Sequence, residues 1–486
     1  MIRRAGILLH PSSLPHFGPC GDLGDSAIRF LDWLQLASIG LWQTLPMHPV
    51  GGGFSPYSSS SAFAGATYLI SLDRLVEQGL LTFSEIGERP SSPRIDEAHI
   101  SQWKRPLIQK AAARYAQNAP EKLTAFKEAH HWAEDWALFH ALKQDLGVHG
   151  WQDFPEALQN RESKALKEAS DRLTHLMNTE IAAQCLFFEQ WNQVRQEAAK
   201  RNIQIIGDMP IFIAQDGCDA WVNRDLFRWD ENNQADPVSG APPDAFSPMG
   251  QHWGNPLYNW EAHRKTGFKW WIERLKGELA LADFVRIDHF RGFCAAWEIP
   301  KSAGGDARQG EWKESPGREL FAAVQEALGQ LPFLAEDLGV ITPDVDQLRE
   351  DFNLMGMKVL QFAFGDYEDP YLPHNYSSPV WACYTGTHDN DTCIGWYHGS
   401  DEVTRHRYRI YTGRSGQEPN WDLIRLAWAS VAQWSITTMQ DILNLGSEGR
   451  MNIPGQAGGH WAWRAHDLPV SAAHRLASLA EAYGRK

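Results

Sequence analysis

The chain has 486 residues, of which 43% are hydrophobic, and it carries a net charge of −15 at pH 7. That length suits one large α/β barrel with insertions, or two to three ordinary domains. The negative charge argues against nucleic acid as a partner, because a protein that binds phosphates needs a basic face.

Nothing in the sequence predicts export or a membrane span. The start, MIRRAGILLHPSSLP, holds an apolar run too short for a secretory signal, and no apolar stretch approaches the length of a bilayer-spanning helix. The six cysteines are scattered without a C-x-x-C pair, which predicts reduced thiols and no metal framework. We therefore expect a cytoplasmic protein; the sequence says nothing of its oligomeric state.

Eight short apolar segments, each running into polar or glycine-rich sequence, are typical of buried strands. Helix-like stretches, such as residues 26–40 and 317–330, lie between most of them. This alternation predicts a parallel sheet, and eight units predict an α/β fold closed as a (β/α)₈ TIM barrel with insertions. The predicted strands are residues 5–10, 41–49, 203–212, 283–290, 332–339, 356–364, 380–389 and 436–445, the last of which also fits a helix.

Two stretches interrupt the alternation. Residues 80–195 contain apolar positions at helical spacing, which predicts a largely helical insertion whose last helix returns to the barrel. Residues 214–262 are rich in Gly, Pro, Asp, Asn and Trp, and so long an irregular stretch is usually a functional lid or binding loop.

The predicted organisation therefore has three parts. Residues 1–79 begin the barrel and carry a candidate sugar-binding loop, and residues 80–195 form the helical insertion. Residues 196–486 complete the catalytic barrel, with a flexible active-site loop at 241–256.

The segment FVRIDHFRG (residues 284–292) carries more charge than a buried strand normally accepts. Period-2 alternation places Arg286 and Asp288 on one face of this strand, with Val285 and Ile287 on the other. We expect the charged pair to face the barrel axis, where Arg286 keeps Asp288 ionised by proximity. A purely structural ion pair is the alternative interpretation.

Carboxylates follow several of the predicted strands, at the end where barrel enzymes place their chemistry. An ionised acid beside a protonated one is the layout of glycoside cleavage, in which one attacks and the other transfers a proton. The apolar run before Glu336 predicts a raised pKa for that carboxyl, whereas Asp337 points the other way as a structural partner. Asp389 could bind sugar hydroxyls or simply form a turn. The acids concerned are Asp208, Asp288, Glu336, Asp337 and Asp389.

The motifs RIDHFRG, LAEDLG and TGTHDND, in that order, resemble those of the α-amylase clan. Longer blocks are similar to the 4-α-glucanotransferases of glycoside hydrolase family 77, also called amylomaltases or disproportionating enzymes. These blocks cover most of the predicted barrel and read GILLHPSSLP, SPYSSSSAFAG, GDMPIFIAQDGCDAW, GAPPDAFSPMGQHWGNPLYNW and MNIPGQAGGHWAWR.

The resemblance implies a role for each candidate residue. Asp288 would be the nucleophile, Glu336 the general acid/base and Asp389 the stabiliser of the transition state. Arg286 and His388 would hold the nucleophile and the sugar. The other implied substrate-binding residues are Tyr57 as a stacking platform, Asp208, Asn255, and Asp244 and Trp253 on the loop over the donor and acceptor subsites.

The resemblance also implies the reaction. Segments of α-1,4-glucan, such as starch, glycogen or maltooligosaccharide chains, would move to the 4-hydroxyl of an acceptor sugar by a retaining double displacement. No metal and no organic cofactor would take part. The implied loop departs from the family pattern at Ala245, where an aromatic residue is expected.

Three alternatives stay open from the residues themselves. An α-1,4-glucan hydrolase would use the same acids, because hydrolysis and transfer share their first half-reaction. A metal-dependent barrel enzyme would need paired histidines on the first strand, which offers only His10. A glucan-binding protein without activity would keep the 22 tryptophans but could dispense with acids at three strand ends.

Overall fold

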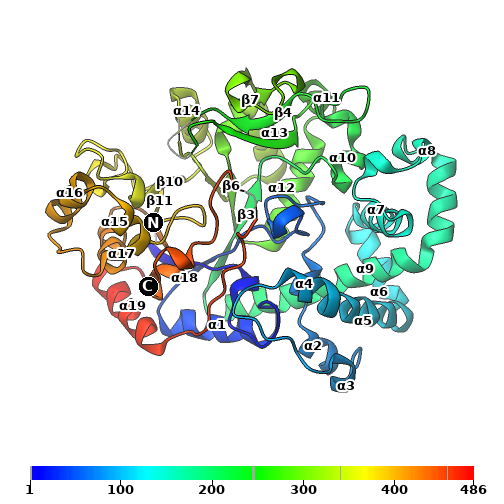
Figure 1. Cartoon of the computed structure of the whole chain (residues 1–486), viewed down its shortest axis with the longest axis horizontal. Coiled ribbons are helices and arrows are strands. Elements are labelled where there is room, and N and C mark those ends of the chain that lie inside the picture. Colours follow the sequence, from blue (N-terminus) through cyan, green and yellow to red (C-terminus); the bar gives the residue numbers. More distant parts are fainter. Residues whose placement is uncertain (1–2, 244–246, 340, 457) are drawn as a thin grey trace.

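The computed structural model describes residues 3–243, 247–339, 341–456 and 458–486 (Figure 1). Its central sheet has the strand order β10-β11-β12-β1-β2-β3-β6-β9, and every pairing within it is parallel. A bridge from Leu334 to Met355 brings the two ends of this sheet together. The predicted (β/α)₈ barrel is therefore confirmed. Its strands are β1 (Arg4–Leu8), β2 (Leu41–Gln43), β3 (Gln204–Pro210), β6 (Phe284–Asp288), β9 (Phe333–Ala335), β10 (Gly356–Val359), β11 (Trp381–Tyr384) and β12 (Trp434–Thr438).

Alternating side chains of these strands separate two apolar regions. The barrel interior is a cluster that includes Leu41, Ile206 and Tyr384, and Phe284 packs against it with its ring 4.6 Å from that of Trp434. Residues of opposite parity, such as Val285 and Ile287 on β6, belong to the larger core under the outer helices. Arg286 and Asp288 consequently share the parity of Phe284 and face the barrel axis, as predicted.

Helices cover the outside of the barrel. In α13, Leu320, Phe321 and Val324 lie on one face at helical spacing and are fully buried. Proline opens α14 and α17, where its missing amide proton costs no hydrogen bond. The helices are α1 (Asp25–Leu36), α11 (Trp260–Lys265), α12 (Lys269–Leu281), α13 (Gly317–Leu328), α14 (Pro343–Asp351), α15 (Cys393–Gly399), α16 (Glu402–Thr412), α17 (Pro419–Ala429), α18 (Met439–Ile442) and α19 (Val470–Tyr483).

The first insertion lies between β2 and β3 and is helical, as the spacing of its apolar residues predicts. Figure 1 shows it as the lobe at the right of the barrel. The predicted returning helix is the second half of α9, a 38-residue helix that ends four residues before β3. The insertion contains α2 (Leu72–Glu77), α3 (Phe83–Ile86), α4 (Glu97–His99), α5 (Arg105–Asn118), α6 (Pro120–Ala129), α7 (Ala133–Leu146), α8 (Glu156–Gln159) and α9 (Ser163–Lys200).

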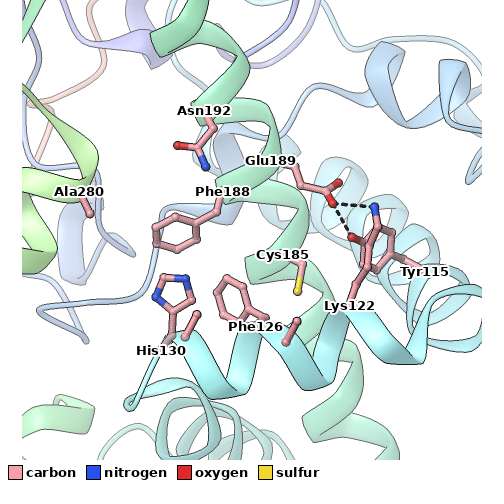
Figure 2. A pocket seen from close by; sticks show the side chains of 11 residues that line it. Tyr115, Lys122, Phe126, His130, Cys185, Phe188, Glu189, Asn192 and Ala280 are labelled. Atoms are coloured by element: carbon pink, nitrogen blue, oxygen red, sulfur yellow. Dashed lines mark hydrogen bonds and ion pairs between the residues drawn. The ribbon is translucent and has the colours of Figure 1, made fainter.

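A cavity of about 480 Å³ lies among α5, α6 and α9 in this lobe (Figure 2). The rings of Phe126, His130 and Phe188 form one side of it, and Phe126 and His130 lie 4.2 Å apart. At the other side, Glu189 accepts hydrogen bonds from the Tyr115 hydroxyl at 2.6 Å and from the Lys122 ammonium at 2.9 Å.

The second insertion corrects the prediction of a long irregular stretch at 214–262. After the short helix α10 (Cys218–Val222), this stretch supplies two strands to an antiparallel sheet of order β5-β4-β7-β8. Within the predicted loop 241–256, residues Gln251–Pro256 form β5, which pairs antiparallel with β4. Strand β4 pairs with β7, which lies about 60 residues further along the chain, so no local pattern indicates the pairing. The strands are β4 (Val238–Ala241), β5 (Gln251–Pro256), β7 (Ala295–Ile299) and β8 (Glu311–Glu314).

The eighth barrel strand is also shifted from its prediction. It runs from Trp434 to Thr438, and the apolar residues that follow form α18 instead of continuing the strand. The Thr438 hydroxyl accepts a hydrogen bond from the Asp441 amide at 3.3 Å, which caps the helix and ends the strand. Among the described residues, none of the helices is both long and apolar enough to cross a bilayer, and the six cysteines are unpaired.

Candidate active site

A cavity of about 650 Å³ opens at the carboxyl ends of the barrel strands. Asp288 at the end of β6, Glu336 just after β9 and Asp389 beyond β11 all line it. The parallel strands bring these residues together from positions up to about 100 residues apart. The structure thus places the three predicted catalytic acids around one cavity.

Arg286 joins two carboxylates beneath this cavity. One terminal nitrogen of its guanidinium lies 2.8 Å and 3.0 Å from the two oxygens of Asp208, and the other lies 2.9 Å from Asp288. Burial raises the pKa of Asp208 to about 6, against the opposing effect of Arg286. Burial alone would lower the pKa of Arg286, but Asp208 and Asp288 raise it well above its usual range. The guanidinium therefore stays charged beside Asp288.

Glu336 is held by backbone donors and kept protonated by its surroundings. Its carboxyl oxygens accept hydrogen bonds from the amides of His289 at 2.7 Å and Leu338 at 3.1 Å. Burial raises its pKa to about 8, and the nearby Asp288 adds to that effect while Arg286 opposes it. At neutral pH this carboxyl therefore carries a proton that it can donate.

Asp337 occupies the other side of the chain, as predicted. It accepts a hydrogen bond from the Met357 amide at 2.7 Å and pairs with Arg349 at 3.2 Å. These contacts tie β9 to β10 and α14. Asp337 is a structural partner with no place in the cavity lining.

Asp389 is the ionised counterpart of Glu336. The side-chain amide of Asn452 donates to it at 2.6 Å, and His388 Nε2 lies 3.3 Å from its other oxygen. Burial alone would raise the pKa of Asp389, but His388, Asn452 and Arg286 hold it well below its ordinary value. Arg450 fixes the backbone by donating to the Asp389 carbonyl at 2.7 Å. A residue that only formed a turn would not need these three contacts, so they favour a role in binding for Asp389.

Aromatic rings form the wall beside Asp389. Tyr57 stacks on His388 with ring centroids 5.0 Å apart and planes 20° apart, and Trp461 lies 5.5 Å from Tyr57. The Tyr57 hydroxyl donates to Asp208 at 2.7 Å. The predicted platform is thus joined to the same charge network as the nucleophile candidate.

The remaining predicted binding residues differ in their exposure and in their hydrogen-bond partners. Trp253 on β5 is 37% exposed, and its ring meets the edge of His289 at 4.8 Å. Asn255 lines the cavity, but its amide donates to the Ile213 carbonyl at 2.7 Å and its oxygen accepts from Ser239 at 3.3 Å. Its visible role is to hold β5. Asp244 lies outside the described residues.

Several residues that line the cavity were not identified from the sequence, and three of them contact the acids or the aromatic wall. Asn452 and Trp461 lie in the block MNIPGQAGGHWAWR, beyond β12, where no strand end predicts them. His289 adopts a left-handed backbone conformation with φ 53°, which is uncommon for a residue other than glycine. That conformation aims its amide at Glu336. Nothing in the amino-acid composition indicates this backbone conformation of His289.

His10, the one histidine that a metal site on the first strand could use, is occupied elsewhere. Its Nδ1 accepts a hydrogen bond from the Leu45 amide at 3.3 Å, and its Nε2 lies 3.3 Å from the Tyr68 hydroxyl. Burial lowers its pKa to about 3. It therefore acts as a neutral structural histidine between β1 and β2.

Comparison with known proteins gives consistent matches over the full length. A family model described as 4-alpha-glucanotransferase matches residues 9–470. The chain is 46% identical over 503 residues to a 4-alpha-glucanotransferase of Thermus thermophilus, with 99% of each chain covered. It is 44% identical over 497 residues to one from Synechocystis sp., covering 100% of this chain and 98% of that one. The amylomaltase of Streptococcus agalactiae, solved in complex with acarbose, superposes with a TM-score of 0.95 at 35% identity over 99% of each chain.

Proposed function

The chain belongs to the 4-alpha-glucanotransferase family, and from that premise we propose how its residues divide the reaction. The enzyme moves α-1,4-glucan segments from a donor chain to the 4-hydroxyl of an acceptor maltooligosaccharide or glucose. Donors of the starch and glycogen type fit this chemistry. The observation that carries the assignment is the contrast between Glu336, with a pKa raised to about 8, and the ionised Asp389 in one cavity.

In the first half-reaction, Asp288 attacks the anomeric carbon of the donor. The glycosidic bond breaks, its electron pair goes to the departing oxygen, and Glu336 gives that oxygen its proton. The product is a covalent glycosyl-enzyme with inverted configuration at the anomeric carbon. Arg286, 2.9 Å from Asp288, holds the attacking carboxylate in place through an ion pair.

In the second half-reaction, Glu336 takes the proton from the acceptor 4-hydroxyl, whose oxygen attacks the same carbon and releases Asp288. Two inversions restore the α-1,4 linkage. Asp389, fixed by Asn452 and His388, accepts hydrogen bonds from sugar hydroxyls as positive charge develops on the ring. A held acceptor outcompetes water because effective molarities of bound reactants far exceed the concentration of water.

The experiment that tests these roles uses Glu336→Gln. The amide cannot donate a proton as the acid does, so turnover of maltotriose should fall by at least about 10³-fold. Fluoride needs little protonation to depart, so α-maltosyl fluoride should still glycosylate the variant. Mass spectrometry of peptides should then find the sugar on Asp288.

The control is Glu326→Gln, an exposed glutamate on α13, which should keep wild-type turnover. A sugar found on Asp389 or Asp208 would show that the nucleophile has been misassigned. Unimpaired maltotriose turnover in Glu336→Gln would remove Glu336 from the acid/base role.

A further inference from the structure

The active-site cavity extends beyond the residues used in the mechanism, to the antiparallel sheet formed by β5, β4, β7 and β8. Trp312 on β8 lines the same cavity as Asp288 and Glu336. It is half-buried, and it lies opposite Trp297 of β7, with ring centroids 5.2 Å apart. Trp253 lines the cavity from β5, at the opposite edge of this sheet.

Trp312 is fixed by a residue of the catalytic segment itself. The guanidinium carbon of Arg291 lies 3.8 Å from the centroid of the Trp312 ring, the distance of a close cation–π contact. Arg291 is three residues beyond Asp288, and it donates to the Thr342 hydroxyl at 3.0 Å. The ring is therefore preorganised, and a sugar that stacks on it need not order it first.

The chain of contacts places Trp312 on the acid/base side of the scissile bond. His289 donates its amide to Glu336, and Arg291 follows two residues later to contact Trp312. The wall formed by Tyr57 and His388 adjoins Asp389 instead. Because Glu336 protonates the departing oxygen, sugars on its side are those of the leaving group or the acceptor.

We propose that Trp312 forms an acceptor-side subsite for glucose units remote from the reacting 4-hydroxyl, and that it gives the enzyme a preference for long acceptors. This inference rests on the proposed transfer function. A flat indole suits the apolar face of a pyranose. A single glucose reaches only the reacting position, whereas the reducing end of a maltohexaose extends along the wall to Trp312.

The test compares two acceptors with one donor, α-maltosyl fluoride, and quantifies elongated products by chromatography. In Trp312→Ala the KM for maltohexaose as acceptor should rise about tenfold, while the KM for glucose should change less than about twofold. Trp312→Phe, which keeps an aromatic face, should recover most of the affinity for maltohexaose. The control is Trp132→Ala, a half-buried tryptophan of the helical insertion outside this cavity, which should alter neither KM.

An equal rise of both KM values, or no rise for maltohexaose, would overturn the proposal while leaving the transfer function intact. Failure of Trp312→Phe to recover affinity, with its thermal midpoint equal to that of the wild type, would also overturn it. If the wild-type enzyme releases maltose without elongating either acceptor, the transfer function itself fails.

Discussion

Arg286 is the residue that connects the charges of the active site. It is 3% exposed and contacts both Asp208 and Asp288, and Asp208 in turn accepts the hydrogen bond of Tyr57. A planar guanidinium can serve two carboxylates from one fixed position, which an ammonium cannot do. The charges that look misplaced in FVRIDHFRG are thus explained by one side chain that contacts the proposed nucleophile, Asp288.

Replacing Arg286 with lysine tests this bridging role. The positive charge remains, but the ammonium cannot hold Asp208 and Asp288 at once, so kcat for maltotriose should fall at least about 100-fold, or ~2.7 kcal/mol in the barrier. The control is Arg228→Lys, whose partner Glu298 lies on β7. A kcat in Arg286→Lys within twofold of the wild type would contradict the role.

The pH dependence of the reaction follows from Glu336. Its pKa is raised to about 8, so the proton that it must donate is present below that pH and lost above it. The transfer rate on maltotriose should therefore fall about tenfold per pH unit above about 8. With α-maltosyl fluoride, release of fluoride should not show this fall. An unchanged maltotriose rate up to pH 10 would exclude Glu336 as the proton donor.

At the scale of elements, the apolar runs predict where barrel strands begin but not where they end. The predicted strand 41–49 pairs only over Leu41–Gln43. The prediction is too long because the chain stays buried after it leaves the sheet, and its apolar residues therefore continue past the end of the strand. The length of an apolar run in the sequence reflects how many residues are buried, and not how many of them pair with a neighbouring strand. The antiparallel sheet escapes prediction because β8, with the sequence EWKE, is short and polar, and because β4 pairs with β7, which is distant in sequence. Asn452 and Trp461 escape for the same reason, since only tertiary contacts bring them to the site.

One buried pair holds the segment that carries Tyr57. His48, just after β2, contacts Glu278 of α12 at 2.8 Å, and its other nitrogen lies 2.8 Å from the Ala64 carbonyl. Burial alone would lower the pKa of His48, but Glu278 raises it above its ordinary value. The stability gained from the protonated imidazole is therefore fully present below pH 6.5 and is lost as the pH rises through the raised value.

Glu278→Gln should reveal this dependence. The variant should lose about 1–3 kcal/mol of stability at pH 6, and less at pH 9, where a smaller fraction of His48 is protonated in the wild type. Thermal midpoints of variant and wild type at the two pH values measure the difference. Glu319→Gln, which removes an exposed partner of Arg264, should shift the midpoint at neither pH. An equal loss at both pH values would contradict the assigned protonation.

At the scale of the whole molecule, the two ends of the chain meet where β12 pairs with β1. Arg485 is fully buried and donates to backbone carbonyls that include those of Trp428 at 2.7 Å and Ala432 at 3.0 Å. Arg3 donates to the Trp428 carbonyl as well, at 2.8 Å. These contacts hold α17, β12 and the C-terminal residues together beside the pairing of β12 with β1.

Arg485→Met should therefore destabilise the entire barrel. The shape of the side chain is largely kept, but several carbonyls lose a charged donor, at a cost of at least about 3 kcal/mol. A lower thermal midpoint with unchanged kcat at moderate temperature is the expected result. Lys486→Met, one residue later and exposed, is the matched control. If both variants unfold at the wild-type midpoint, the contacts of Arg485 do not contribute to the thermal stability of the barrel.

Products formed from pure maltotriose test most directly whether the site transfers glucan rather than hydrolysing it. Each bond broken by Asp288 and Glu336 should be replaced by a new α-1,4 bond to a held acceptor. Glucose should therefore appear together with a ladder of longer maltooligosaccharides, while the total of reducing ends stays nearly constant. A steady rise in reducing ends, with glucose and maltose and no longer products, would make this enzyme a hydrolase and contradict the account.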